Sequence, residues 1–490
     1  MRFLTAITAS MILSACALGP DFMRPLTAGD EQDQFLNEAQ TPENPQSMNA
    51  WWTRINDPLL DTYINDLLAQ NLSLKQASER VIQAAERKDI ERSALFPNLS
   101  GGGSGSRQFT PGSSFNNGLL TSDRIYTNNV NVGLDAAWEI DLFGRIRRST
   151  ESARAAFRAS IYDREALAHS LIADVLERRV AIAVNAELLD LAVQNAQNRK
   201  QFYDLVESRY ELGSSETSAS DVLLARENYA SVQADIHSFQ RLLADEIFAL
   251  DVLLGQPPGT TNPLVSDFPV LAPPRDVAIC VPAALLDRRP DLRASELRAK
   301  AANADIGVAI ADLYPTLNLA GSLGFSDNEA TTAIFNANQL AGSILADITM
   351  PLFNAGALRS NVRIQESEAR ELAAAYAEDV LNAMREVESA LVAEHQLEAE
   401  LENLALATKS LRDAEVIGED RYKRGVISLT EFLDIQQRRY TIEQSYLRLQ
   451  QTKWNTRIAL YLALGGDWLS EGNNENMPAC RAPSAENEET

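Results

Sequence analysis

Residues from which most catalytic and metal sites are built are rare in this sequence. Its 490 residues include only three histidines and three cysteines. The histidines are far apart and have no cysteine or carboxylate motif around them, whereas zinc sites and histidine-based catalysis need clustered partners. Phosphate-binding loops, dinucleotide-binding motifs, HExxH and GxSxG are also missing. The sequence therefore predicts neither an enzyme nor a bound cofactor.

Positive charge and long apolar runs are scarce as well. The chain has 44 basic against 68 acidic residues, and its formal net charge of −24 argues against binding of duplex nucleic acid. Beyond the N-terminus, no stretch approaches the roughly 18 apolar residues that indicate a membrane-spanning helix. Any further membrane crossing must then use strands. With 45% hydrophobic residues, the chain is still rich enough to bury a sizeable core.

The N-terminus has the pattern of an export signal. Arg2 precedes a short apolar run, which ends in Leu13-Ser14-Ala15-Cys16. A positive flank, a short apolar stretch and small residues before a cleavage site are typical of a secretory signal. The cysteine at this position resembles the bacterial lipobox, so we expect removal of residues 1–15 and acylation of Cys16. The alternative is an ordinary signal peptide with a chance cysteine.

Export would leave two further thiols, Cys280 and Cys480. Cys280 lies in a proline-rich linker at 256–289, and Cys480 lies in a polar, acidic tail at 467–490. An even pair in an oxidising compartment suggests a disulfide, and the alternative is two free or buried cysteines.

The chain between these regions contains two repeats. Four landmark strings recur in the same order at offsets of 218, 210, 212 and 210 residues. Four matches at nearly one offset are hard to produce by chance, and internal repeats of this kind decide the fold. The paired strings begin at Phe96 and Tyr314, Asp141 and Pro351, Arg209 and Arg421, and Leu254 and Leu464.

Repeat 1, residues 57–255, follows an extended N-terminal segment at 16–56. Its first helix begins at Asp57-Pro58, where a capping residue precedes a first-turn proline, and is expected to run to Leu95. A strand pair near 99–141 follows, although its first strand is weakly marked because it is mostly Gly and Ser. A long helix at 149–212 contains no proline or glycine and would span about 96 Å. After a turn at Gly213, a return helix covers 220–254.

Repeat 2, residues 290–466, has the same parts in the same order. A helix precedes a strand pair near 317–352, a long helix follows at 357–424, and a return helix covers 429–464. Apolar residues in both long helices recur with a period near 3.5, which is the coiled-coil signature.

The strand segments have the pattern of membrane strands. Between Val130 and Ile140, apolar residues alternate with small or polar ones over about the length that a tilted membrane strand needs. A soluble two-faced sheet would show the same alternation. In lipid, the open edges of four strands would leave unpaired backbone groups that cost several kcal/mol each, and closure needs about eight strands or more. The chain is therefore expected to oligomerise, as a dimer, a trimer or a larger ring.

Specific strings now identify a family resemblance. The chain resembles the TolC-like outer-membrane factors, in the NodT-type lipoprotein branch of tripartite efflux systems, over nearly all of residues 16–466. The strings that carry the resemblance are Cys16 to Phe22, Trp51-Trp52, Trp138 to Arg145, and Asp287-Arg288-Arg289-Pro290-Asp291.

The resemblance implies a fold, a location and partners. The fold is mainly α with membrane β, in which long coiled-coil-like helices form a periplasmic tunnel and four strands per chain contribute to a trimeric 12-stranded barrel. The protein would be lipid-anchored in the outer membrane of a Gram-negative bacterium and would extend into the periplasm. Its partners would be two further copies, a periplasmic adaptor (membrane fusion protein) and an inner-membrane pump. Its function would be a passive exit duct for small molecules and drugs.

The resemblance also assigns a periplasmic gate. Tyr422 matches the family's gating tyrosine, and Asp221 and Asp434 match its constriction aspartates, whose ring would favour cations. Ile427 stands where the family archetype has a gating arginine, so closure here is expected to use other contacts. The alternative for both aspartates is a carboxylate near a helix N-terminus that interacts with the helix dipole.

Two other functions share much of this pattern. One is an outer-membrane channel for type I protein secretion, which would use the same fold. The other is a coiled-coil scaffold lipoprotein with no pore, which would not explain the alternating strands.

Overall fold

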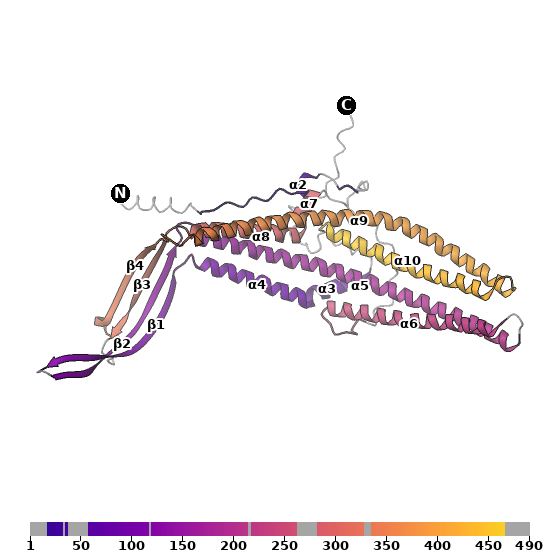
Figure 1. The fold of residues 1–490 in the computed structure, drawn as a ribbon, viewed down its shortest axis with the longest axis horizontal. Coiled ribbons are helices and arrows are strands. Elements are labelled where there is room, and N and C mark those ends of the chain that lie inside the picture. The colour runs from indigo at the N-terminus through magenta and orange to yellow at the C-terminus, as the bar shows by residue number, and fades with distance from the viewer. Residues whose placement is uncertain are drawn as a thin grey trace, which may run out of the picture. The chain divides into compact units, whose positions relative to one another are not determined.

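The computed structural model describes residues 17–32, 35–37, 57–116, 119–213, 217–261, 282–327 and 335–465 (Figure 1). The chain divides into two units. Unit 1 comprises Met1–Pro25, Arg80–Ile161 and Ala294–Tyr376, and unit 2 comprises Leu26–Glu79, Tyr162–Arg293 and Ala377–Thr490. Each unit therefore takes segments from both sequence repeats. Among the described residues, no helix combines the length and the hydropathy needed to cross a membrane.

Unit 1 contains an antiparallel sheet in the order β1-β2-β3-β4. Strands β1 and β2 form one pair, β3 and β4 form the other, and β2 pairs with β3 from Val130↔Asp327 to Ile140↔Leu317, which joins the two repeats. The outer edges of β1 and β4 have no partner strand among the described residues. The strands are β1 (Asn98–Asn116), β2 (Leu119–Ile140), β3 (Thr316–Asp327) and β4 (Leu340–Thr349), and the short 3-10 helix η4 (Ala337–Gln339) precedes β4.

β1 is a full-length strand although its sequence marks it weakly. It pairs with β2 along its whole length, from Asn98↔Ala137 to Asn116↔Leu119. Gly and Ser supply little side-chain pattern, so the strand is held by backbone hydrogen bonds to a neighbour with a strong pattern of its own.

Apolar side chains of the sheet are exposed in the single chain. Ile344 is 93% exposed, and Leu99 and Ile348 are more than two thirds exposed. Exposed apolar surface on this scale marks a membrane or protein contact.

Four helices adjoin the strands: α4 (Leu72–Ser93), α5 (Arg145–Glu211), α8 (Pro290–Ala311) and α9 (Ala357–Lys423). α5 and α9 have 67 residues each, about 100 Å of helix. α5 begins at Arg145, four residues before the expected start at 149. The carboxylate of Asp141 accepts hydrogen bonds from the Arg147 backbone nitrogen and from its Nε, so it caps the first turn.

Unit 2 adds α2 (Ala28–Glu31), α3 (Pro58–Gln70), α6 (Ala219–Leu253), α7 (Pro282–Arg288) and α10 (Leu429–Ala463). Its core contains large apolar side chains from both repeats, packed as the heptad spacing predicts. Large side chains that are fully buried in unit 2 are Trp454, Tyr461, Phe432, Leu60, Leu67, Ile172, Leu176, Ile182, Leu250 and Leu254.

The expected single helix from 57 to 95 is wrong, because α3 and α4 are separate helices that meet at Asn71. The Asn71 amide donates to the Leu253 carbonyl at 2.7 Å, and its Oδ1 accepts from the Leu74 nitrogen at 2.8 Å. A buried Asn that bonds to backbone groups competes with helix continuation and caps the next helix. The break at Asn71 therefore combines a local cap of α4 with a long-range hydrogen bond to Leu253 of α6.

The string Asp287 to Asp291 has a structural role in unit 2. Arg289 donates to both oxygens of Asp291, to Glu386 on α9 at 2.7 Å and to the Ala463 carbonyl at the end of α10. A cation near a helix C-terminus satisfies free carbonyls there. Arg289 thus joins the start of α8 to both α9 and α10.

Candidate functional site

The turns α5–α6 and α9–α10 are held by glycines. Gly213 and Gly425 have φ values of 74° and 71°, and their nitrogens donate to the carbonyls of Tyr210 and Tyr422, respectively. Positive φ after a helix end favours glycine, so both helices end in the same left-handed cap. The two turns are therefore structural counterparts, and Tyr210 is the counterpart of Tyr422.

Tyr422 packs into an aromatic cluster near these turns, and Tyr210 does not. The Tyr422 ring lies 5.1 Å from Phe202 of α5 and stacks on Phe432 of α10 at 5.8 Å, measured between ring centroids. Tyr210 is 47% exposed. The cluster connects the two repeats within one chain. Its buried members are Phe202, Val206, Ala225, Leu429, Phe432 and Leu433.

Arg209 is a member of this site that the sequence reasoning missed. Its guanidinium carbon lies 5.7 Å from the centre of the Tyr422 ring. Burial raises the pKa of the Tyr422 hydroxyl, a hydrogen bond and the charge of Arg209 oppose the rise, and the charge of Asp221 adds to it. The structure thus brings Arg209 and Tyr422 together, and the charge of Asp221 acts on the same hydroxyl. The sequence places Arg209 beside Tyr210, in a string that matches Arg421-Tyr422, and no local pattern pairs Arg209 with Tyr422.

Asp221 also has a local role. It is the third residue of α6, and its Oδ2 accepts from the backbone nitrogen and the Oγ of Ser218, both at 2.8 Å. This capping box satisfies free donors at the helix start. Asp221 therefore serves the helix N-terminus as the alternative interpretation expected, and its charge also contributes to the raised pKa of Tyr422.

Asp434 occupies a different position. It lies beyond the first turn of α10, is exposed, and pairs with Arg438 at 2.8 Å. The counterpart of Asp221 in repeat 2 is Glu431, whose backbone nitrogen is capped by Ser428 and which the sequence reasoning also missed. Within the described residues of one chain, no hydrogen bond or ion pair joins Asp221 to Asp434. A carboxylate ring would therefore have to form between copies.

Ile427 takes part in the aromatic cluster. Its partly buried side chain packs against the buried members. Where the resemblance expects an arginine, this chain thus has an apolar contact, and the cation beside Tyr422 comes from α5 instead.

A buried polar layer joins the two repeats elsewhere in unit 2. Arg199, 2% exposed, donates to the Asn228 carbonyl at 3.0 Å and to Gln437 Oε1 at 2.9 Å. Burial lowers its pKa. Arg439 bonds to Asn195 at 3.3 Å and to Glu443 at 2.6 Å. Buried charges persist only when they are paired and hydrogen-bonded, so this layer fixes α10 against α5 and α6.

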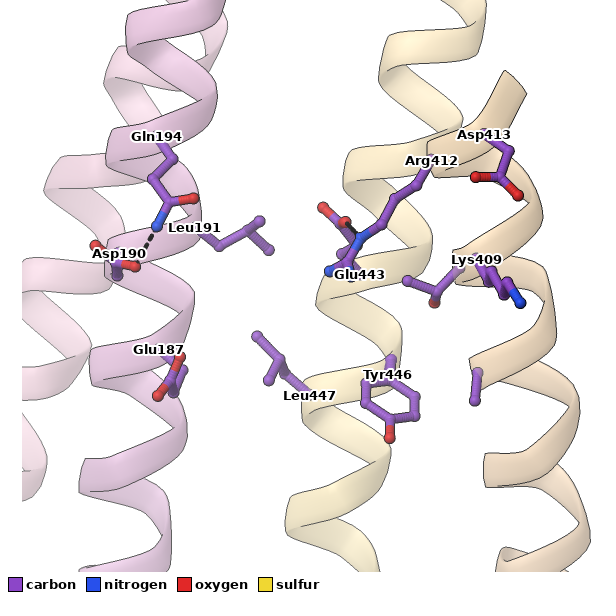
Figure 2. A pocket seen from close by; sticks show the side chains of 12 residues that line it. Glu187, Asp190, Leu191, Gln194, Lys409, Arg412, Asp413, Glu443, Tyr446 and Leu447 are labelled. Atoms are coloured by element: carbon purple, nitrogen blue, oxygen red, sulfur yellow. Dashed lines mark hydrogen bonds and ion pairs between the residues drawn. The ribbon is translucent and has the colours of Figure 1, made fainter. Parts of the chain in front are cut away.

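A cleft of about 510 Å³ lies among α5, α9 and α10, as Figure 2 shows. Leu191 and Leu447 extend into the space between α5 and α10, and the Arg412 Nε donates to Glu443 at 2.6 Å. The charged and polar side chains around it are Glu187, Asp190 and Gln194 of α5, Lys409, Arg412 and Asp413 of α9, and Glu443 and Tyr446 of α10. The lining of the cleft therefore carries side chains of both charges. Among the described residues, no group of three or more His, Cys, Asp or Glu side chains is arranged to hold a metal ion.

Cys16, Cys280 and Cys480 lie outside the described residues, so the acylation and the disulfide stay predictions. The segment after Cys16 is described and lies in unit 1 beside the end of β2. The Leu18 nitrogen donates to the Phe143 carbonyl at 3.2 Å, and buried Arg148 donates to the carbonyls of Leu18 and Gly19 and to Asp21. Gly19 and Gly307 allow close approach, since a Cβ on Gly307 would lie 2.6 Å from the Leu18 carbonyl.

Comparisons with known proteins agree with this architecture. Residues 63–256 and 281–466 match the model of the family described as outer membrane efflux protein, so both repeats are covered. The probable efflux pump outer membrane protein TtgC of Pseudomonas putida is 29% identical over 479 residues, which is 97% of each chain. Nodulation protein T of Rhizobium leguminosarum bv. trifolii is 29% identical over 478 residues, 96% of this chain and 98% of that one.

A solved structure has the same fold. The outer-membrane channel OprN matches with a TM-score of 0.82 at 29% identity, over 92% of this chain and 100% of that chain. The expected fold class, mainly α with four strands in two repeats, is confirmed. The chain belongs to the outer membrane efflux protein family, the outer-membrane channel components of efflux pumps, located in the outer membrane of Gram-negative bacteria and extending into the periplasm.

Proposed function

We propose that three copies of this chain close a 12-stranded barrel in the outer membrane and form a passive exit duct for small molecules. The observation that carries the proposal is the open four-stranded sheet, whose β1 and β4 edges lack partner strands among the residues that the structure describes. Unpaired backbone groups in lipid cost several kcal/mol each, so the edges must pair between copies. Two copies would give eight strands, which side chains fill, whereas three leave room for a channel.

The partners follow from the same assignment. A periplasmic adaptor and an inner-membrane pump would deliver cargo to the duct, and the pump would supply the energy, because the sequence carries no nucleotide-binding motif. The chain itself would have no catalytic role.

Planar-bilayer recording tests the duct. Purified trimers inserted into lipid are expected to carry ionic current, because a 12-stranded ring encloses water. Trimers without measurable current would support a scaffold with no pore.

Deletion of the gene is expected to increase drug susceptibility. Loss of secretion of a polypeptide without a change in susceptibility would instead support type I secretion.

Asp221 and Asp434 are proposed to form the constriction when copies meet. The double substitution Asp221→Ala with Asp434→Ala should raise conductance and lower cation preference, since a carboxylate ring in a narrow pore attracts cations. The matched control is Asp204→Ala with Asp420→Ala, which removes equal charge from exposed pairs with Lys200 and Arg424. Equal current and selectivity in both double variants would contradict the assignment.

Cys16 is proposed to carry the lipid anchor. Its neighbours Leu18 to Asp21 are held beside the end of β2, which would keep acyl chains close to the membrane. Cys16→Ser should abolish incorporation of radiolabelled palmitate and leave the signal peptide uncut at this site. Persistent labelling of the variant would refute the proposal.

The predicted Cys280–Cys480 bridge is checked by peptide mapping of the same preparation with and without reductant.

A further inference from the structure

A second cavity, in unit 1, has a charge opposite to that of the chain. It has a volume of about 420 Å³ and is formed by the start of α5, the middle of α8 and the end of the α4 segment. Its lining carries four cations and one carboxylate. The charged side chains are Arg147, Arg154, Arg158 and Lys300 together with Glu151, and the rest of the lining is Leu95, Thr150, Ala155 and Leu297. In a protein of net charge −24, a local excess of three positive charges stands out and attracts anions.

Three of these cations are free within the chain. Arg147 pairs with Asp141 at 3.1 Å, and Glu151 is already engaged by Arg148 at 2.9 Å. Arg154, Arg158 and Lys300 have no hydrogen-bond or ion-pair partner in the described part of the chain. Guanidinium groups that converge on a cavity are suited to the oxygens of a phosphate.

Along the sequence, one of the helices that line the cavity begins close to the end of a strand. α5 begins five residues after β2 ends at Ile140, and Arg147 is within the first turn of α5. Trp138, near the end of β2, donates its indole N–H to the Leu95 carbonyl at 3.1 Å, so it holds one wall of the cavity. Tryptophan with an apolar ring and a polar N–H is typical of the membrane interface. With β2 in the membrane, the start of α5 would lie near the headgroup layer.

The cavity stays open when copies of the chain assemble through the sheet. β2 and β3 pair with each other, and within the described ranges the edges without a partner strand belong to β1 and β4. α5 follows β2 and α8 precedes β3, so their shared cavity lies within one chain rather than at a sheet edge. The apolar wall formed by Leu95, Ala155 and Leu297 suits an acyl or glycerol group beside the phosphate.

We propose that this cavity binds the phosphate headgroup of an anionic phospholipid from the periplasmic leaflet of the outer membrane. Arg154 and Arg158 of α5 and Lys300 of α8 hold the phosphate, and the leucines contact the apolar part of the lipid. Basic pockets between helices at a membrane surface recognise anionic headgroups in this way. The proposal rests on the proposed function, because it needs the strands to lie in the membrane.

Native mass spectrometry of the purified full-length protein tests the site with phosphatidylglycerol as the probe. Arg154→Gln with Arg158→Gln should weaken phosphatidylglycerol binding about thirtyfold, since each basic residue near the surface contributes about a factor of five. Arg154→Lys with Arg158→Lys keeps the charge and should stay within about fivefold of the wild type. This second variant separates loss of binding from loss of folding.

The chain offers a matched control in another unit 1 cavity of about 590 Å³. There Arg80 and Arg87 of α4 lie with Glu91 and Asp305, so the charge is balanced. Arg80→Gln with Arg87→Gln removes the same charge from the same unit and should leave phosphatidylglycerol binding within about twofold of the wild type.

Several results would overturn the lipid site. One is an equal loss of phosphatidylglycerol binding in the two glutamine variants. Another is binding of zwitterionic phosphatidylethanolamine as tight as that of phosphatidylglycerol, and a third is full displacement of phosphatidylglycerol by millimolar inorganic phosphate. Binding of peptidoglycan fragments in place of lipid, lost in the Arg154→Gln with Arg158→Gln variant, would also overturn it. Conductance of the same preparations is recorded in parallel. Conducting trimers without lipid retention refute only the lipid site, whereas a wild-type protein that does not conduct refutes the duct.

Discussion

Tyr422→Ala is expected to raise the mean conductance of the assembled channel at least about fivefold, because loss of a packed aromatic ring costs roughly 3–5 kcal/mol of the arrangement that it stabilises. The ring contacts Phe202 of α5 and stacks on Phe432 of α10, so it ties the two repeats together at the helix turns. Arg209 lies against the same ring. Without the ring, α9 loses its aromatic contacts with α5 and α10 at this level, although Phe202 still packs on Phe432, and the closed arrangement is expected to be less favoured.

The control for this prediction is Tyr210→Ala. Tyr210 stands at the equivalent position of repeat 1, precedes the equivalent glycine turn and is 47% exposed, so its removal should change conductance little. Tyr422→Phe keeps the stacking and loses only the hydroxyl, and should lie between the wild type and the alanine variant. Single-channel recording at one salt concentration compares the four proteins. A Tyr210→Ala channel that opens as much as Tyr422→Ala would show that the aromatic cluster does not hold the closed form.

Asp57→Ala should destabilise the helical part of unit 2 by about 3–5 kcal/mol, the cost of breaking a buried ion pair. Asp57 Oδ2 lies 2.8 Å from Arg179 Nε, and the two side chains are only 4% and 3% exposed. The same carboxylate caps α3 by accepting from the Leu59 nitrogen at 3.0 Å. Removal of Asp57 therefore takes away a helix cap and the counter-charge of a buried arginine at once. The measurement is thermal or denaturant unfolding at one fixed protein concentration, since assembly also stabilises the fold.

Two variants separate the contributions in this prediction. Ser428→Ala removes a cap of α10 that has no buried ion pair, and should cost only about 1 kcal/mol. Asp57→Asn keeps the capping oxygen and removes the charge, so it isolates the pair with Arg179. If Asp57→Ala is no more destabilising than Ser428→Ala, the buried ion pair with Arg179 does not stabilise the fold as predicted.

Local features of the fold were predictable because they depend on neighbouring residues. The cap at Asp57-Pro58, the glycine turns at 213 and 425, and the heptads of α5 and α9 each have a signature within a few residues. The repeat itself is visible in the sequence for the same reason, since each unit of the repeat carries its own signals. β1 was less visible, because its Gly and Ser residues pair through backbone groups that have no side-chain signature.

Contacts between distant segments were not predictable in this way. The pairs Asp57–Arg179 and Arg209–Tyr422 join residues on different helices, and either partner alone has an ordinary local role. Tyr210 and Tyr422 illustrate the difference, since both belong to the same repeated motif and only one is packed. The repeat predicts equivalence, and packing decides which copy of the motif has a role.

The sequence by itself determined the class of this protein: an exported chain of two repeats, with few strands and long heptad helices, that matches outer-membrane efflux proteins. Composition, caps and periodicity predict the repeats, the strands and the long helices, because they act over one or two turns of chain. The family resemblance is carried by specific strings such as Trp138 to Arg145 and Asp287 to Asp291. Only the tertiary structure decided the contact of Asn71 with α6, the cation beside Tyr422 and the convergence of Arg154, Arg158 and Lys300 on one cavity. These depend on which helix faces lie together, and that is a property of packing across more than a hundred residues of sequence rather than of any local pattern.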